Sequence, residues 1–279
     1  MTVKIVTDST SDLTPEIASK LGITVVPLYV HFGTDAYRDG IDLTTEEFYQ
    51  KLTQGKTLPL TAAPAPGTFA EVYDKLAEET DEILAIVISS KYSATYQAAV
   101  EGKELRKSKA RVEIIDSLWA TMGLGLIAIS AAKAAQAGAS FNEVIDIAQN
   151  SMRRVDMRMA FDTLEYLRRG GRIGTAQAFL GSMLKVNPII TIKDGYTEAV
   201  TRSRCRAKAI GYLYNFATSF SYIDEMAVED ATTPDEAEML VERLGSKFPK
   251  EHIYRTKVSP AVGTHVGPHV LAVSMLGDR

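Results

Sequence analysis

The sequence predicts an α/β protein of two domains, a doubly wound parallel-sheet domain over residues 1–155 and an α+β domain with a mixed sheet over residues 156–279. Its length of 279 residues exceeds that of a typical single domain. In the first half, short β-branched runs alternate with helical patterns, which favours a parallel sheet covered by helices. In the second half, a hairpin signal replaces this alternation, which indicates a mixed sheet.

The first half supplies four expected strands and several helix starts. Residues 15–21 form a helical pattern that ends at Gly22, a residue suited to a left-handed cap. Three pairs have the spacing of a capping box, in which a hydroxyl and a carboxylate satisfy the amides of a first helical turn. The pairs are Thr44 with Glu47, Thr68 with Glu71 and Ser140 with Glu143. The expected strands are residues 3–6, 23–30, 83–88 and 112–115.

The second half contains a turn signal between two apolar runs. Residues 188–192 and 197–201 flank Lys193-Asp194-Gly195, which predicts a β-hairpin. Helices are expected over residues 207–220 and 233–244, and further strands near residues 226–228, 253 and 270–273. The absence of a linker-like segment predicts a broad interface between the two domains.

Composition narrows the class of protein. The N-terminal residues lack the features of a signal peptide, and no apolar run approaches the roughly 18 residues that span a bilayer. A single cysteine, Cys205, excludes an intramolecular disulfide and fits a reducing compartment. The net charge of -4 gives no general attraction to nucleic acids. These observations predict a cytoplasmic protein without a transmembrane segment.

Hydroxyl-rich loops follow three of the expected strands. They are residues 8–10, 89–93 and 116–117. In an open parallel sheet, ligands bind beyond the carboxyl ends of the strands, so these loops predict the rim of a pocket. Ser, Thr and Asp are also ordinary helix caps, so each loop alone has two interpretations.

The common catalytic motifs are absent. The sequence contains no phosphate-binding loop, no HExxH zinc motif, no GxSxG elbow and no cysteine spacing for a metal. Gly123 and Gly125 lie in a helical pattern and indicate close helix packing rather than a dinucleotide site. His265 lies among two glycines and a proline in residues 263–268, which predicts a rigid loop that positions the imidazole.

Two arginine clusters remain. Arg168 and Arg169 precede Arg172, and a second cluster alternates along residues 202–206. If the second segment is extended, its three guanidinium groups project from one face. A solvated surface is the ordinary explanation of such clusters, although arginine also suits carboxylates and phosphates.

Seven segments follow one another in a characteristic order and spacing along the sequence. They are KIVTDSTSDL at 4–13, TAAPAPGTF at 61–69, SSKYSATY at 89–96, IIDS at 114–117, DTLEYLRRGGRIG at 162–174, VNPIITIKDG at 186–195 and VGTHVGP at 262–268. In these segments the chain resembles the DegV family of bacterial lipid-binding proteins over nearly its whole length.

The resemblance implies two α/β domains that enclose an acyl chain, and a role like that of the fatty acid-binding subunit of bacterial fatty acid kinase. That subunit presents a fatty acid carboxylate to a separate ATP-dependent kinase and then carries the acyl phosphate. No cofactor or metal would be held by this chain, and transient membrane contact is expected. By motif, the ligand-binding residues are Thr61, Ser93, Ala94, Thr264 and His265, and the residues that act with the kinase or acyl phosphate are Arg172 and Arg202.

The chain departs from the family pattern in the expected head-group region. Ala62, Ala63 and Ala65 stand where members often have Ser, Gln and Ser, and His269 replaces a frequent glycine. Ala94 also stands where glycine is frequent. These changes predict fewer contacts to the head group or a different ligand.

Three other functions compete with the carrier. An acyl hydrolase or transferase would use Ser93 or Thr61 as nucleophile and His265 as base, with Asp8 or Asp116 as the orienting acid. A lipid-sensing regulator would bind the same ligand without a kinase. Nucleic-acid binding is supported by the arginine clusters alone and is not expected.

Overall fold

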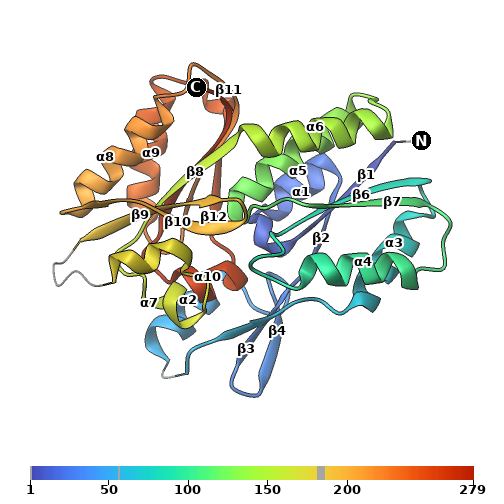
Figure 1. Ribbon diagram of the computed structural model, residues 1–279, viewed down its shortest axis with the longest axis horizontal. Coiled ribbons are helices and arrows are strands. Elements are labelled where there is room, and N and C mark those ends of the chain that lie inside the picture. The colour runs from blue at the N-terminus through green and yellow to red at the C-terminus, as the bar shows by residue number, and fades with distance from the viewer. Residues whose placement is uncertain (1, 56, 181–185) are drawn as a thin grey trace.

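The computed structural model describes residues 2–55, 57–180 and 186–279 and contains a parallel sheet, a six-stranded mixed sheet and a small third sheet (Figure 1). The parallel sheet has the order β2-β1-β6-β7. Its strands are β1 (Lys4–Asp8), β2 (Ile23–Val26), β6 (Glu82–Val87) and β7 (Arg111–Asp116). Each of the four strands expected in the first half contributes a strand to this sheet. The second, expected over residues 23–30, ends in this sheet at Val26.

Helices cover both faces of the parallel sheet. Along β6, Ile83, Ala85 and Val87 pack toward one side and Leu84 and Ile86 toward the other, as the alternation of a strand requires. The first side is covered by α3 (Pro66–Leu76) and α4 (Thr95–Leu105), and the second by α1 (Pro15–Leu21), α5 (Thr121–Gln136) and α6 (Phe141–Arg154). The predicted doubly wound arrangement is confirmed.

The small antiparallel sheet was not expected from the sequence. The predicted strand over residues 23–30 is interrupted at Pro27, which has no amide hydrogen for a ladder, and the chain turns away there. The small sheet has the order β4-β3-β5 and projects with α2 from the bottom of the molecule in Figure 1. Its elements are β3 (Tyr29–Phe32), β4 (Asp35–Arg38), α2 (Thr45–Gln54) and β5 (Leu60–Ala62).

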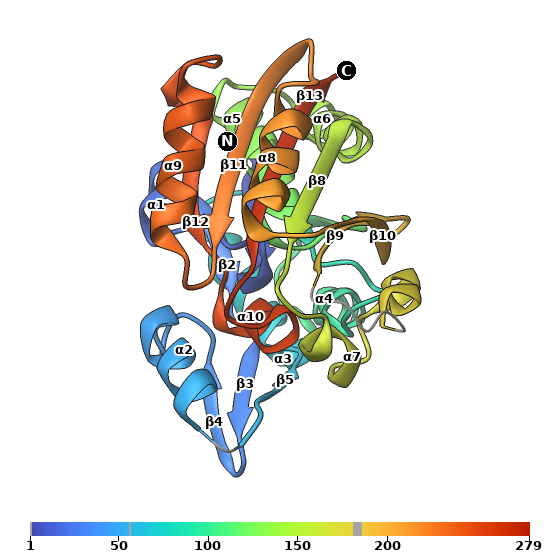
Figure 2. The ribbon, with the colours of Figure 1, turned by 90° about the vertical axis from the view of Figure 1, so that its left-hand side faces the viewer.

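The second half forms the mixed sheet, with the order β10-β9-β8-β13-β11-β12. The β11 and β12 strands are parallel and the other neighbours antiparallel, so the prediction of a mixed sheet is confirmed. Figure 2 shows α8 (Arg206–Ala217) and α9 (Pro234–Gly245) lying along one face. The strands are β8 (Val155–Ala160), β9 (Asn187–Lys193), β10 (Tyr196–Ser203), β11 (Tyr222–Asp230), β12 (Ile253–Lys257) and β13 (Leu271–Asp278).

Helix α5 packs between the parallel and the mixed sheet. It contacts β1 on one side and β8, β11 and β13 on the other. A methyl group at Gly125 would lie 2.5 Å from the Ser11 carbonyl oxygen, so this glycine serves close packing as predicted. One hydrophobic core therefore runs through both halves, and the division at residue 155 stays a prediction.

Two local predictions were wrong, and the condition attached to a third interpretation was not met. Helix α3 begins at Pro66, a residue favoured in a first turn, so Thr68 is already inside it and caps nothing. The segment around His265 is not a loop but the short helix α10 (Pro260–Val266). Strand β10 ends at Ser203 and α8 begins at Arg206, so the second arginine cluster is not one extended face. The capping boxes at Thr44 and Ser140 are both present.

Among the described residues, no helix is long and apolar enough to cross a membrane. The remaining short elements are α7 (Glu165–Arg169) and three 3₁₀ turns, η1 (Ser9–Ser11), η2 (Gly174–Phe179) and η3 (Lys250–His252). Of these, η1 and α7 border the cavity described below, together with α10.

Candidate functional site

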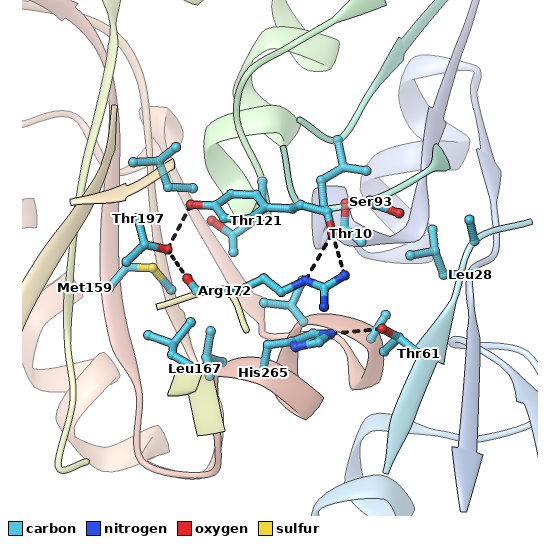
Figure 3. Close-up of a pocket in the computed structure, with 18 of the residues that line it drawn as sticks. Thr10, Leu28, Thr61, Ser93, Thr121, Met159, Leu167, Arg172, Thr197 and His265 are labelled. Atoms are coloured by element: carbon cyan, nitrogen blue, oxygen red, sulfur yellow. Dashed lines mark hydrogen bonds between the residues drawn. The ribbon is translucent and has the colours of Figure 1, made fainter. Parts of the chain in front are cut away.

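A cavity of about 250 Å³ lies where the two halves meet. Its walls come from the loops after β1 and β6, from β5 and the start of α5, and from β8, β9, α7 and α10 (Figure 3). Most of the lining is apolar. The larger apolar side chains are Leu28, Ile88, Met159, Leu167, Ile190, Ile192 and Val262.

Part of the polar lining lies beyond the carboxyl ends of the parallel strands, where ligands bind in open parallel sheets. We call this the strand-end rule. Thr10 follows β1, and Tyr92 and Ser93 follow β6, so two of the three hydroxyl-rich loops reach the cavity. The third loop does not, because Asp116 accepts hydrogen bonds from the Ser90 and Leu118 amides and so holds a turn. Both interpretations of these loops, pocket rim and local cap, are therefore realised in different places.

Thr61 and His265 meet at one wall of the cavity. The Thr61 hydroxyl lies 2.9 Å from His265 Nε2 and joins β5 of the small sheet to α10 (Figure 3). Burial, and next the charge of Arg172, lowers the pKa of His265 to about 4. The imidazole is therefore neutral near pH 7. Its Nδ1 has no hydrogen-bond partner among the described residues and packs against Gly170, where a methyl group would overlap it.

Arg172 supplies positive charge to the same wall. Its Nε and Nη2 donate to the Tyr92 carbonyl at 3.1 and 2.8 Å, and Nη1 donates to the Gly170 carbonyl at 2.6 Å. No carboxylate in the described part of the chain lies within ion-pair distance of it. Three of the five N–H groups are thus used, and the charge itself is uncompensated beside the cavity. An anionic ligand group would complete this arrangement.

Thr197 and Tyr92 hold Arg172 in place. The Thr197 hydroxyl donates to the Arg172 carbonyl at 2.6 Å and lies 2.9 Å from the Tyr92 hydroxyl. Both side chains line the cavity. Figure 3 shows Thr197 beside Arg172. The loop after β6, the hairpin strand β10 and the turn after α7 are therefore joined around the guanidinium.

The remaining predicted residues lie in different surroundings. Ser93 lines the cavity and caps the first turn of α4, where its oxygen lies 2.8 Å from the Thr95 hydroxyl and accepts from the Thr95 amide at 3.2 Å. Ala94 lines the cavity beside it. Thr264 does not line it, because its hydroxyl donates to the Pro260 carbonyl within α10. Arg202 is exposed and stacks on Phe179 at 5.0 Å, outside the cavity.

The structure does not assemble a nucleophile, base and acid. Asp8 accepts from the Thr10 and Ile88 amides at 3.0 and 2.7 Å, and Asp116 holds the turn described above. Neither carboxyl contacts His265, whose Nε2 is engaged with Thr61 rather than Ser93. Among residues 2–55, 57–180 and 186–279, no cluster of His, Cys, Asp and Glu has the geometry to hold a metal ion.

Several lining residues were not singled out as site residues from the sequence. They are Thr10, Tyr92, Thr121 and Thr197. Arg172, which also lines the cavity, was expected to act with the kinase or the acyl phosphate and not among the ligand-binding residues. The strand-end loops contained a signal for Thr10 and Tyr92. Thr197 carries no such signal, because it lies in a hairpin strand whose position against the loop after β6 depends on the fold.

Comparison with known proteins places this geometry in a family. The DegV family model matches residues 2–278. The chain belongs to the DegV family. A DegV domain-containing protein from Caldanaerobacter subterraneus subsp. tengcongensis is 35% identical over 97% of each chain.

Two solved DegV structures are similar to this one over nearly their whole length. A DegV family protein from Thermus thermophilus, described for its fatty acid binding, superposes with a TM-score of 0.91 at 33% identity, covering 99% of this chain and all of that one. DegV from Bacillus subtilis, a fatty acid binding protein, gives 0.89 at 29% identity with 99% of each chain covered. The predicted family and fold are both confirmed.

Proposed function

We propose that this DegV protein binds one long-chain fatty acid, with its carboxylate between Arg172 and the Thr61–His265 pair and its acyl chain along the apolar wall. One observation carries the proposal: a mostly apolar cavity ends beside a guanidinium that has no acidic partner in the described part of the chain. A ligand with a long apolar tail and one negative charge matches both features. The fatty acid binding of the Thermus and Bacillus relatives supports the same assignment.

Burial of the acyl chain supplies most of the binding free energy. About 14 methylenes at roughly 0.8 kcal/mol each give a gross driving force of some 11 kcal/mol. A neutral hydrogen bond to the head group contributes about 1 kcal/mol net. Thr61, Ser93 and His265 therefore orient the carboxylate, while the apolar wall retains the ligand.

We further propose that the bound carboxylate is presented to a separate ATP-dependent kinase and that the chain then carries the acyl phosphate. The sequence contains no phosphate-binding loop, so ATP and its metal would come from the partner. Arg202, exposed on β10, lies on the side of the hairpin where a partner can reach it, and Arg172 lies at the head group itself. The two arginines thus have separate roles, Arg202 in partner contact and Arg172 in holding the carboxylate or acyl phosphate.

The hydrolase alternative lacks its geometry. The Ser93 hydroxyl is engaged by Thr95, and the oxygen next to His265 belongs to Thr61. No acid orients the imidazole among the described residues, since its Nδ1 packs on Gly170. Thr61 does have the imidazole in hydrogen-bond reach, but without an orienting acid the two residues do not form the triad that this alternative requires.

Lipid analysis of the purified protein tests the binding proposal. Protein purified without added lipid should release about one equivalent of long-chain fatty acid on extraction, because a dry apolar cavity takes up an apolar ligand. Native mass spectrometry that finds only ligand-free protein, and no uptake of palmitate or stearate, would refute it. Incubation with the kinase and ATP then separates a carrier, whose ligand becomes an acyl phosphate, from a lipid-sensing regulator, whose ligand does not change.

A further inference from the structure

Two buried carboxyl groups, one from each half of the chain, face each other away from the cavity. Asp12 follows η1 and is 4% exposed, and Glu229 lies in β11 and is fully buried. The two side chains lie close enough for each to influence the pKa of the other. Burial raises the pKa of Asp12 well above its usual range, to which the neighbouring Glu229 charge adds, and burial raises the pKa of Glu229 to about 7. The two groups therefore titrate as one pair.

Each carboxyl also caps a helix of the opposite half. Asp12 Oδ1 accepts a 3.0 Å hydrogen bond from the amide of Ser259, the N-cap residue of α10. Glu229 Oε2 accepts from the amide of Met122 in the first turn of α5, at 3.4 Å. Neither helix has a side-chain cap of its own. The pair thus supplies both missing caps across the boundary between the halves.

One oxygen of each carboxyl is left without a conventional donor. Asp12 Oδ2 and Glu229 Oε1 are both buried and have no hydrogen-bond partner in the described part of the chain, although the Ser259 hydroxyl lies near Asp12 and the Thr121 hydroxyl near Glu229. Two ionised carboxyls in contact would leave both oxygens unsatisfied and would repel each other. A single proton held between them satisfies both oxygens at once.

The charged groups around the pair favour this singly protonated state. Tyr49 from α2, Asp39 after β4 and Asp8 of β1 add no positive charge. Arg255 of β12 attracts Glu229, but it and Lys257 are ion-paired with Asp230. No cation in the described residues is within ion-pair distance of Asp12 or Glu229. Full ionisation would add a second negative charge to a site that water does not reach.

We propose that Asp12 and Glu229 share one proton and form a latch between the two halves, and that loss of this proton speeds exchange of the ligand. The link to the cavity is direct. The helix capped by Asp12 carries His265, and the helix capped by Glu229 begins at Thr121, and both residues line the cavity. Ionisation strengthens each amide hydrogen bond, so each helix stays with its capping carboxyl, while repulsion between the two charges moves the halves apart and loosens two walls of the cavity together. The part that concerns exchange rests on the proposed fatty acid binding.

Amide variants mimic the closed latch. Asn in place of Asp12 keeps the oxygen that accepts from Ser259, and its amide N–H replaces the shared proton. Asn also tolerates the left-handed backbone of this position, where φ is 53°. Glu229→Gln likewise keeps the oxygen that accepts from the Met122 amide, and its side-chain N–H replaces the shared proton. A matched control is Glu225→Gln, a buried carboxyl in the same strand that pairs with Lys133 and lies outside the cavity lining.

Transfer of radiolabelled palmitate to phosphatidylcholine vesicles measures exchange. In the native protein and in Glu225→Gln, the rate should rise about tenfold per pH unit while the pair remains mostly protonated, since the open fraction follows the deprotonated fraction. In Asp12→Asn and Glu229→Gln, it should change less than about twofold over the same range, because no proton can be lost. An equal pH dependence in all four proteins would overturn the latch.

A second measurement needs no ligand. The infrared carbonyl band of protonated buried carboxyls, to which Asp39 also contributes, should be weaker near neutral pH in each of Asp12→Asn and Glu229→Gln than in the native protein, and unchanged in Glu225→Gln. Hydrogen exchange at the first turns of α5 and α10 should accelerate as the Asp12–Glu229 part of the band disappears with rising pH. A band of native intensity in Asp12→Asn and Glu229→Gln refutes the latch even if palmitate binds, whereas failure to bind palmitate refutes only the proposed function.

Discussion

The cavity wall around Arg172 and the boundary around Asp12 and Glu229 both contain ionisable groups without a partner of opposite charge among the residues that the structure describes, but the charge is balanced differently in the two regions. At the wall, a guanidinium has no acidic partner in the described part of the chain and borders an apolar space. At the boundary, two carboxyls have no basic partner among the described residues and are sealed in the core. The wall retains its charge, which a ligand can neutralise, while the boundary is neutralised in part by a proton. The cavity wall is therefore suited to binding an anionic ligand, whereas the boundary needs no ligand to balance its charge.

The neighbouring groups follow the same division. His265, beside Arg172, is kept neutral by a lowered pKa, so the wall carries one positive charge and not two. Asp39, near the carboxyl pair, has its pKa raised to about 7 by burial. Near Arg172 a second positive charge is therefore disfavoured, and near Asp12 and Glu229 a further negative charge is disfavoured.

Truncation of one latch carboxyl should have the largest effect. Glu229→Ala leaves a cavity in the core and the Met122 amide without its acceptor, and should lower the free energy of unfolding by about 3–5 kcal/mol. Glu229→Gln, which keeps the hydrogen bond, should lose no more than about 1 kcal/mol. Denaturant titration of both variants near neutral pH measures this. Equal losses would show that the contact between the two carboxyls is unimportant.

The pH dependence of stability should have opposite signs in the two regions. His265 binds a proton in the unfolded chain below its ordinary pKa of 6.5 but in the fold only below about 4, so its contribution is lost as pH falls through that window. Asp39 keeps its proton in the fold up to about pH 7, so its contribution is greatest below pH 3.8 and is lost as pH rises to about 7. Each contribution is on the order of 3–4 kcal/mol.

Two variants separate these contributions. His265→Asn should reduce the loss of stability on the acid side of pH 6.5. Asp39→Asn should reduce the loss between about pH 4 and 7, to which Asp12 and Glu229 also contribute, and leave the protein more stable than the native form above it. Denaturant titrations at a series of pH values give both slopes. A His265→Asn protein that retains the native acid-side slope would contradict the neutral buried imidazole.

Arg172 should matter more than Arg202 for the isolated protein. Arg172→Ala removes three hydrogen bonds to the Tyr92 and Gly170 carbonyls and should cost about 1–3 kcal/mol of stability as well as ligand affinity. Sequence reasoning alone predicts little effect on lipid content or melting temperature for either arginine. Arg202→Ala, at an exposed stacked side chain, should keep both and reduce only kinase-dependent phosphorylation. The same melting temperature for both variants would contradict the structural role of Arg172.

The hydroxyls at the head group should have the smallest effect on retention. Thr61→Val and Ser93→Ala each remove about 1 kcal/mol, against the much larger contribution of the acyl chain. Extracted lipid should therefore stay near one equivalent while phosphorylation by the kinase falls. Loss of all lipid from a folded Ser93→Ala protein would show that the head group, and not the acyl chain, retains the ligand.

Much of the fold could be predicted because its signals are local. The buried run at residues 83–88 and the helix closed by Gly22 depend on neighbouring residues alone, and the structure has both within a residue or so. The small sheet was missed because one apolar stretch on either side of Pro27 serves two different sheets. The helix around His265 was missed because Gly263 suggested a loop. Gly263 is instead required for close packing, since a methyl group at this position would lie 2.6 Å from the Tyr49 hydroxyl.

The site could be predicted only in part. The resemblance to DegV proteins named Thr61, Ser93 and His265, and the strand-end rule indicated two of the loops that line the cavity. The place of Arg172 depends on the turn after α7, and the contact of Asp12 with Glu229 joins segments far apart in the sequence. No periodicity or motif in a single sequence records such pairings.

A crystal structure of the protein with bound palmitate would show whether the cavity and Arg172 together form the fatty acid site. We expect the acyl chain along Leu28, Met159 and Ile190, and the carboxylate within hydrogen-bond distance of Thr61 or His265 and of a free N–H of Arg172. A palmitate bound outside this cavity, or bound within it with the carboxylate away from Arg172, would refute this assignment.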